Sequence, residues 1–280
     1  MKILLAIDGS KYSRWAIDLL LALPLAESPD VTVMHVVEGG PVVHALIAPS
    51  EKRAFDRALR KHMDRDLAKA QQLVARSVDR LSARWKKVRA VLEEGLVADT
   101  IINRAQRNKV DLIILGSRGL GHVSTFLMGS VSQKVIAHAP CSVLVVKKKT
   151  RGIKEVLVAL DGSKDADGAV VFLGSNFLRE KIRSTVLYAW EYPYRLPESA
   201  VAIIKERCIQ VMKTAGLEAK FQFVSGQVAK RIVEIATQGK TDLVVVGSRG
   251  LTGLKRFLLG GISQKVVLHS SASVLVVRRR

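Results

Sequence analysis

The chain has 280 residues, of which 48% are hydrophobic and only 5% aromatic, and its formal net charge is +20. This length suits two domains, and the scarcity of aromatic residues beside many Val, Ile and Leu runs favours parallel α/β architecture over a β-sandwich. No apolar run approaches the ~18 to 20 residues of a membrane span, so we expect no membrane insertion. Asp8 interrupts the first apolar run too early for a signal peptide.

The two cysteines, Cys141 and Cys208, lie far apart in the chain and imply no disulfide framework, so a cytoplasmic location is expected. The excess of positive charge has two explanations. It is either a solvated basic surface, which we favour, or a means of attracting polyanions such as nucleic acid, an acidic membrane face or nucleotides. No helix-turn-helix, zinc ligand set or aromatic RNA-binding strand accompanies the charge, which argues against a sequence-specific nucleic-acid module.

Residues 2–7 form the first apolar run and predict a short strand that is buried on both faces. Asp8-Gly9-Ser10 then turns the chain into a helix with apolar residues at helical spacing: Trp15, Ala16, Leu19, Leu20 and Leu23. Asp8 therefore lies at the carboxyl end of the first strand, where doubly wound sheets bind ligands. Both Asp8 and Ser10 can instead cap the helix, and for Ser10 we favour that role.

Residues 31–37 predict a second strand, in which His35 is expected to be a packed core histidine. After a loop with two prolines comes a long amphipathic helix with apolar side chains every three or four positions: Phe55, Leu59, Met63, Leu67, Ala70, Val74, Val78 and Leu81. Its other face is basic and is the best candidate for weak, nonspecific polyanion binding: Arg53, Arg57, Arg60, Lys61, Arg65, Lys69, Arg76, Arg80 and Arg84. A solvated helix face is the favoured alternative.

Residues 87–92 predict the third strand and residues 97–107 the third helix. The stretch 111–146 then reads as an apolar strand, a glycine-punctuated loop, a helix and a second apolar strand. Three glycines in it allow backbone to approach a ligand without an intervening Cβ: Gly116, Gly119 and Gly129. The unpaired N–H groups of the following helix start, together with the helix dipole, form an anion site that suits a phosphate.

The same stretch occurs a second time over residues 242–277, without a gap and with about half of its positions identical. This is a duplication of a whole domain. We place the domains at 1–149 and 153–280, around a basic connector. The second half repeats the order of elements from Asp161 on, and the first half has 22 extra residues between its first strand and its glycine loop.

Three types of motif recur in order in both halves: a beginning of the type ILLAIDGS, the spacing Gly-x2-Gly-x9-Gly after an apolar strand, followed by Ser in the first half, and an ending of the type HAPCSVLVV. With them the chain resembles the universal stress protein family over almost its whole length. The resemblance implies two tandem doubly wound domains, each with a five-stranded parallel sheet of the Rossmann-like, adenine nucleotide alpha hydrolase-like type. It also implies that the last strands of the two halves, 142–146 and 273–277, pair with one another, and that two chains form a homodimer.

The resemblance implies ATP as the ligand and leaves open whether Mg²⁺ or Mn²⁺ bridges its phosphates. In the first half the residues it places around the nucleotide are Ala6, Asp8, Val36, Gly116, Arg118, Gly119, Gly129, Ser130 and Val131. In the second half they are Asp161, Gly247, Gly250, Gly260 and Gly261. Val36 is expected near the adenine, through main-chain groups.

Ser130 and Gln133 also match a capping box, so helix capping alone can explain them. Gly261 replaces this serine in the second half and removes one hydroxyl contact to phosphate, a loss of about 1.5 to 3 kcal/mol. Nucleotide binding is therefore expected to be weaker there.

The sequence shows neither a Cys/His metal set nor a nucleophile with a base and an orienting group, so no catalytic residue is assigned. The leading hypothesis is an ATP-binding, nucleotide-dependent stress-response regulator without strong catalysis. Three alternatives stay open: a nucleotide-free tandem scaffold, a slow ATPase, and a basic protein that coats nucleic acid.

Overall fold

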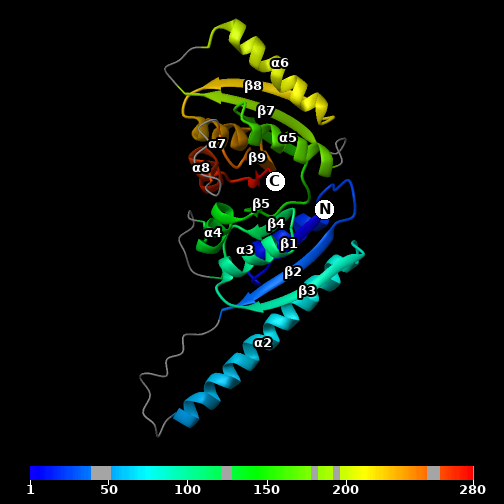
Figure 1. Ribbon diagram of the computed structural model, residues 1–280, viewed down its shortest axis with the longest axis vertical. Coiled ribbons are helices and arrows are strands. Elements are labelled where there is room, and N and C mark those ends of the chain that lie inside the picture. The colour runs from blue at the N-terminus through cyan, green and yellow to red at the C-terminus, as the bar shows by residue number, and fades with distance from the viewer. Residues whose placement is uncertain (39–51, 121–127, 178–181, 192–195, 251–258, 280) are drawn as a thin grey trace.

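The computed structural model describes residues 1–38, 52–120, 128–177, 182–191, 196–250 and 259–279, with the backbone alone for 52–62 (Figure 1). The elements of the first half are β1 Lys2–Ala6, α1 Lys11–Ala22, β2 Asp30–Val37, α2 Lys52–Ser82, β3 Lys87–Glu94, α3 Val97–Arg107, β4 Leu112–Gly116, α4 Ser130–His138 and β5 Ser142–Val146. Those of the second are β6 Glu155–Leu160, α5 Lys164–Asn176, β7 Arg183–Trp190, α6 Glu198–Thr214, β8 Ala219–Ser225, α7 Val228–Gln238, β9 Leu243–Gly247, α8 Gly261–His269 and β10 Ser273–Val277. The predicted strands and helices are confirmed, with bounds shifted by a few residues.

The two halves form one continuous sheet of ten strands in the order β3-β2-β1-β4-β5-β10-β9-β6-β7-β8. Within each half every pairing is parallel, as predicted. The junction is antiparallel, with Leu144 of β5 opposite Leu275 of β10. The expected pairing of the two terminal strands is thus confirmed, and it removes two apolar strand edges that would otherwise invite association.

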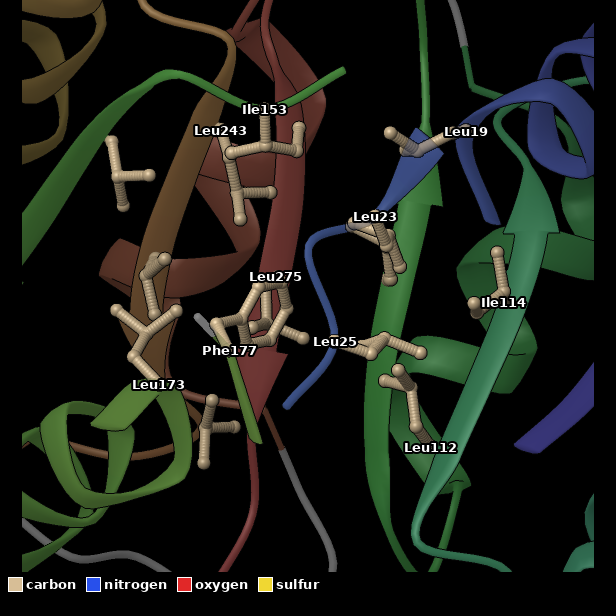
Figure 2. Packing of buried hydrophobic residues seen from close by; sticks show 14 of the residues in the cluster. Leu19, Leu23, Leu25, Leu112, Ile114, Ile153, Leu173, Phe177, Leu243 and Leu275 are labelled. Carbon is tan, nitrogen blue, oxygen red and sulfur yellow. The ribbon is translucent and has the colours of Figure 1, made fainter. Parts of the chain in front are cut away.

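Helices cover both faces of this sheet (Figure 1). One buried cluster joins α1, α2, α5 and α6 to one face, and a second joins α3, α4, α7 and α8 to the other. Both clusters run across the junction of the halves. Figure 2 shows this for the first cluster, where Leu25 and Phe177 meet between β5 and β10 and also form an isolated antiparallel bridge. The core is therefore shared by both halves.

The extra length of the first half appears in α2, which has 31 residues against 17 in α6. Its apolar stripe is only partly covered: Ala70, Val74 and Leu81 are buried, whereas Met63 is 50% and Leu67 42% exposed. The amino-terminal part of α2 extends away from the sheet (Figure 1), which explains this exposure. The side chains of Phe55 and Leu59, like those of the basic residues before position 63, lie outside the described residues.

Candidate functional site

Each half has a switch point, where neighbouring strands send their connections to opposite faces of the sheet. In the first half β1 pairs with β4, and the chain continues from β1 into α1 on one face and from β4 toward α4 on the other. Such a switch point opens a crevice at the carboxyl ends of the strands. β6 and β9 form the same arrangement in the second half.

The turn after β1 joins Asp8 to the helix and to the glycine loop. Asp8 Oδ1 accepts a hydrogen bond of 2.9 Å from the Ser10 N–H, and Ser10 Oγ accepts one of 3.1 Å from the Ser13 N–H, so the predicted cap role of Ser10 is confirmed. A Cβ at Gly119 would lie 2.7 Å from Asp8 Oδ2. The loop backbone thus passes close over the carboxylate, and a larger residue at position 119 would require the Asp8 side chain to shift.

The second half repeats this turn closely. Asp161 Oδ1 accepts from the Ser163 N–H at 2.9 Å, and a Cβ at Gly250 would lie 2.7 Å from Asp161 Oδ2. The glycines within the two turns, Gly9 and Gly162, have φ of 80° and 81°, in the region that favours glycine. The predicted site residues of both turns are thus brought together with their loops.

Gly116 serves helix packing, which differs from the ligand approach expected from the sequence. A Cβ on Gly116 would lie 2.6 Å from the Cβ and 2.8 Å from the carbonyl carbon of Tyr12, at the start of α1. Gly247 stands equally close to α5, 2.8 Å from the Ala166 nitrogen. Both glycines let a helix start lie against the end of a strand. Gly129 and Gly260 are less restricted, with nearest distances of 3.4 Å.

The start of α4 corrects the predicted capping box. The cap residue is Gly129, and Ser130 is the first helical residue, with its side chain exposed. Gln133 donates through Nε2 to the Met128 carbonyl at 2.8 Å and not to the backbone of Ser130. Because glycine has no side chain, no side-chain acceptor at the cap position takes the N–H groups of the first turn.

The start of α8 has the same form, with Gly260 as the cap and Gly261 in the place of Ser130. The two other helix starts at these crevices differ, because α1 and α5 are capped by Ser10 and Ser163. The uncapped starts of α4 and α8 thus fit an anionic group from a ligand.

Ala6 and Val36 are both buried at the carboxyl ends of β1 and β2, and Val131 is half-buried in the first turn of α4. The loop residues 121–127 and 251–258 lie outside the described residues.

Two serines that the sequence reasoning did not single out hold the loops. Ser132 Oγ donates to the Ser117 carbonyl at 2.9 Å, and Ser263 Oγ donates to the Gly247 carbonyl at 2.7 Å. Each joins the first turn of its helix to the end of the preceding strand. The two serines occupy the same position of the duplicated stretch, and this repetition could have identified them from the sequence.

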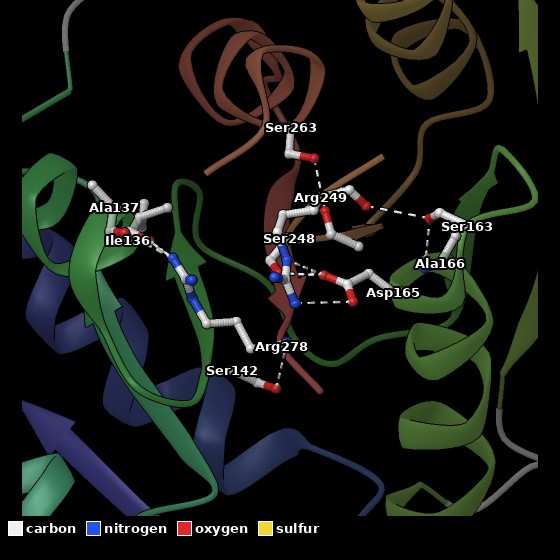
Figure 3. Close-up of polar contacts among 11 residues, drawn as sticks. Ile136, Ala137, Ser142, Ser163, Asp165, Ala166, Ser248, Arg249, Ser263 and Arg278 are labelled. Carbon is white, nitrogen blue, oxygen red and sulfur yellow. Dashed lines mark hydrogen bonds and ion pairs between the residues drawn. The ribbon is translucent and has the colours of Figure 1, made fainter. Parts of the chain in front are cut away.

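The arginines of the two loops have different partners. Arg118 Nη1 donates to the Tyr12 hydroxyl at 3.2 Å, and its guanidinium lies 5.6 Å from the centre of that ring. Arg249 instead pairs with the carboxylate of Asp165, through Nε at 3.0 Å and Nη2 at 3.4 Å, and the Asp165 side chain is only 9% exposed (Figure 3). Ser248 Oγ also donates to Asp165, at 2.7 Å. A buried carboxylate therefore neutralises Arg249, whereas Arg118 contacts the hydroxyl group and the ring of Tyr12.

A basic side chain from each half reaches the last helix of the other half. Arg278 Nη2 donates at 2.8 Å to the carbonyls of Ile136 and Ala137, at the end of α4 (Figure 3). Lys147 Nζ donates to the carbonyls of Leu268 and Ser270, at the end of α8, at 3.4 and 2.7 Å. Cations at helix carboxyl termini interact favourably with the helix dipole.

Burial lowers the pKa of both groups. The pKa of Lys147 falls to about 8, through burial and then through the nearby charge of Arg118. The pKa of Arg278 is also lowered, by burial and then by Arg249. Each cation therefore lies close to the loop arginine of its own half.

Among the residues that the structure describes, no three His, Cys, Asp or Glu side chains gather in a way that could hold a metal ion. In the same residues, no helix is long and apolar enough to cross a membrane.

The fold and the two crevices define a tandem α/β protein with a Rossmann-like half on each side of an antiparallel junction. The chain belongs to the universal stress protein family, whose profile matches residues 1–147 and 152–278. A universal stress protein of Mycolicibacterium smegmatis is 26% identical over 303 aligned residues, which cover 99% of this chain and 97% of that protein. One from Thermus aquaticus is 36% identical over 146 residues, 52% of this chain and 97% of its own length.

The same architecture is found in a crystal structure of a universal stress protein from Archaeoglobus fulgidus. The TM-score is 0.73 at 22% identity, with 99% of this chain and 96% of that chain covered. A universal stress protein structure from Pseudomonas aeruginosa gives a TM-score of 0.65 at 18% identity. These likenesses show the tandem fold.

Proposed function

We propose that this protein binds ATP in the crevice of its first half and acts as a nucleotide-dependent regulator in stress responses. The observation that carries the proposal is the meeting of Asp8, Gly119 and the uncapped first turn of α4 at the switch point of the sheet. Adenine nucleotide binding is common in the family to which the chain belongs.

Residues with distinct chemistry would hold each part of the nucleotide. The first-turn N–H groups of α4 and the Ser130 hydroxyl suit the phosphates, and Arg118 supplies a cation nearby. The carboxyl ends of β1 and β2, with Ala6 and Val36, would receive the adenine through main-chain groups. Asp8 lines the crevice and suits a ribose hydroxyl as a hydrogen-bond acceptor.

The second half would bind the same ligand more weakly, for two reasons. Gly261 offers no hydroxyl, and Asp165 neutralises Arg249. Since a carboxylate beside the loop repels phosphate, the second reason adds to the first.

A divalent cation would arrive with the nucleotide. Because no cluster of three His, Cys, Asp or Glu side chains occurs in the part of the chain that the structure describes, Mg²⁺ or Mn²⁺ would depend on the phosphate oxygens for most of its ligands. We propose no catalytic residue, so any ATP hydrolysis would be slow. We also propose the domain division at 1–149 and 153–280, and a homodimer of the tandem chain.

Isothermal titration of nucleotide-free protein with ATP and AMP, with magnesium at moderate salt, tests the proposal. We expect one strong site per chain, weakened by about 1.5 to 3 kcal/mol in Ser130→Ala through loss of a hydrogen bond to a charged group. Gly261→Ala is the matched control, because it places an alanine at the equivalent position of the second half without removing a hydroxyl.

Absence of heat in nucleotide-free wild type would refute ATP binding and leave the tandem scaffold. Two equal sites would contradict the predicted weakness of the second half.

A further inference from the structure

A cavity of about 520 Å³ opens at the amino ends of the strands of the first half, far from the candidate nucleotide crevice. It lies under the carboxyl end of α3, against the exposed parts of β1, β2 and β3. Lys2 lines it, whereas Asp8, at the other end of the same strand, lines the crevice. At about 3.3 Å per residue these two positions are roughly 20 Å apart.

The lining of this cavity is strongly basic. Five cationic side chains and one carboxylate surround it: Lys2, Arg89, Arg104, Arg107, Lys109 and Asp30. Asp30 pairs with Arg89 at 2.6 Å, and Arg104 pairs with Glu93 at 2.6 Å. Arg104 Nε is buried and has no hydrogen-bond partner among the described residues. The two ion pairs fix the orientation of two guanidinium groups. Lys2 and Arg107, which belong to no ion pair among the described residues, give the cavity its excess of positive charge.

The second half shows that the fold does not require this charge. Its equivalent cavity, of about 300 Å³, has no Lys or Arg in its lining. At the positions equivalent to Lys2, Arg104 and Arg107, the second half has the uncharged or acidic residues Glu155, Ile235 and Gln238. Moreover, α3 ends with two arginines in its last turn, whereas α7 ends with no basic residue in that turn. Stabilisation of the helix end therefore does not account for the cations.

We propose that this basic cavity binds a compact oligophosphate, a ligand with two or more linked phosphate groups. Charge-assisted hydrogen bonds from guanidinium and ammonium groups are the strongest contacts a protein offers to phosphate. The volume lies in the range of small-molecule sites. Val91 and Val110 give part of the wall an apolar surface, which leaves room for an organic group on the ligand.

Titration calorimetry with inorganic tripolyphosphate tests this proposal on the full chain. The cavity variant is Lys2→Gln with Arg107→Gln, because both side chains line the cavity and neither belongs to an ion pair among the described residues. The control variant is Arg76→Gln with Lys86→Gln, which removes the same charge from exposed positions outside it. Circular dichroism checks that both variants are folded.

We expect the cavity variant to bind tripolyphosphate about tenfold more weakly and the control to bind nearly as wild type does. Binding should persist in the presence of saturating AMP, and should weaken as salt is added. A parallel titration with ATP distinguishes a nucleotide from free oligophosphate as the source of the phosphates. Equal losses in the two variants would reduce the site to general charge attraction. Displacement by AMP, or no binding by wild type, would overturn the proposal.

Discussion

Glycines of the two loops look alike in the sequence but meet different surroundings. Gly116 faces Tyr12 at a distance that admits no Cβ, whereas nothing lies within 4 Å of a Cβ at Gly261. The sequence pattern assigned both to ligand binding. Only the packing of α1 on β4 shows that Gly116 serves the core, because a repeat of glycines carries no information on what each one touches.

Gly116→Ala should therefore destabilise the protein, whereas Gly261→Ala should not. We expect a loss of about 1 to 3 kcal/mol in the free energy of unfolding for the first, through overpacking against the backbone of α1. The second should be neutral or stabilising by up to about 1 kcal/mol, since alanine is the better helix residue. Urea unfolding followed by circular dichroism measures both. Equal effects would contradict the assigned roles.

Asp165 makes a second prediction at the scale of single residues. Asp165→Asn keeps the size of the side chain but removes the charge that holds Arg249 and accepts from Ser248. We expect a loss of stability of about 1 to 3 kcal/mol, together with tighter ATP binding in the second half. Tyr12→Phe, at the equivalent position of the first half, is the control and should change stability little. Unchanged nucleotide binding in Asp165→Asn would show that Arg249 does not limit the second site.

At the scale of elements, the sequence predicted the strands and helices well because their apolar runs and periodicities are strong. It failed at contacts between elements. The capping box predicted Ser130 as the cap residue, but Gly129 is the cap and Ser130 is already the first residue of the helix. No periodicity in the sequence reveals this shift by one residue. The stripe on α2 predicted a packed face, although the sheet is too short to cover Met63 and Leu67. Asp8 and the glycine loop could be placed together, since both follow buried strands.

The crossed contacts of Lys147 and Arg278 were not predicted, because they depend on how the halves meet. The pKa of Lys147 falls from 10.5 to about 8 on folding. Between these values the unfolded chain holds a proton that the folded protein has lost, so stability rises with pH from about 8 to 10.5. Below pH 8 the cost of burying the charge is fully present.

Lys147→Met removes this component. We expect the difference in free energy of unfolding, wild type minus variant, to grow by about 2 kcal/mol between pH 7 and pH 9.5. Urea titrations at the two pH values measure it. Arg278→Met is a useful comparison, because a guanidinium stays protonated over this range and the difference for this variant should be flat. A constant difference for Lys147 would contradict the proposed loss of its proton.

At the scale of the whole molecule, the continuous sheet and the shared core should make the two halves unfold together. Trp15 and Trp85 report on the first half and Trp190 on the second. Fluorescence of Trp190→Phe and of the double variant Trp15→Phe with Trp85→Phe should therefore give coincident urea transitions after correction for the stability of each variant. Leu275→Ala, at the junction, should lower both transitions by about 2 to 5 kcal/mol. Separate midpoints would show that each half folds on its own.

The antiparallel junction also determines where the proposed sites of the two halves lie relative to one another. β5 and β10 run in opposite directions, and every other pairing is parallel. The carboxyl ends of the strands of the two halves therefore point toward opposite ends of the sheet. A protein that contacts one end of the sheet would therefore meet only one of the two proposed nucleotide sites. The basic cavity, at the amino ends of the strands of the first half, lies at the same end of the sheet as the proposed nucleotide site of the second half. Because both copies belong to one polypeptide, mutations can change the site at one end of the sheet without changing the site at the other end.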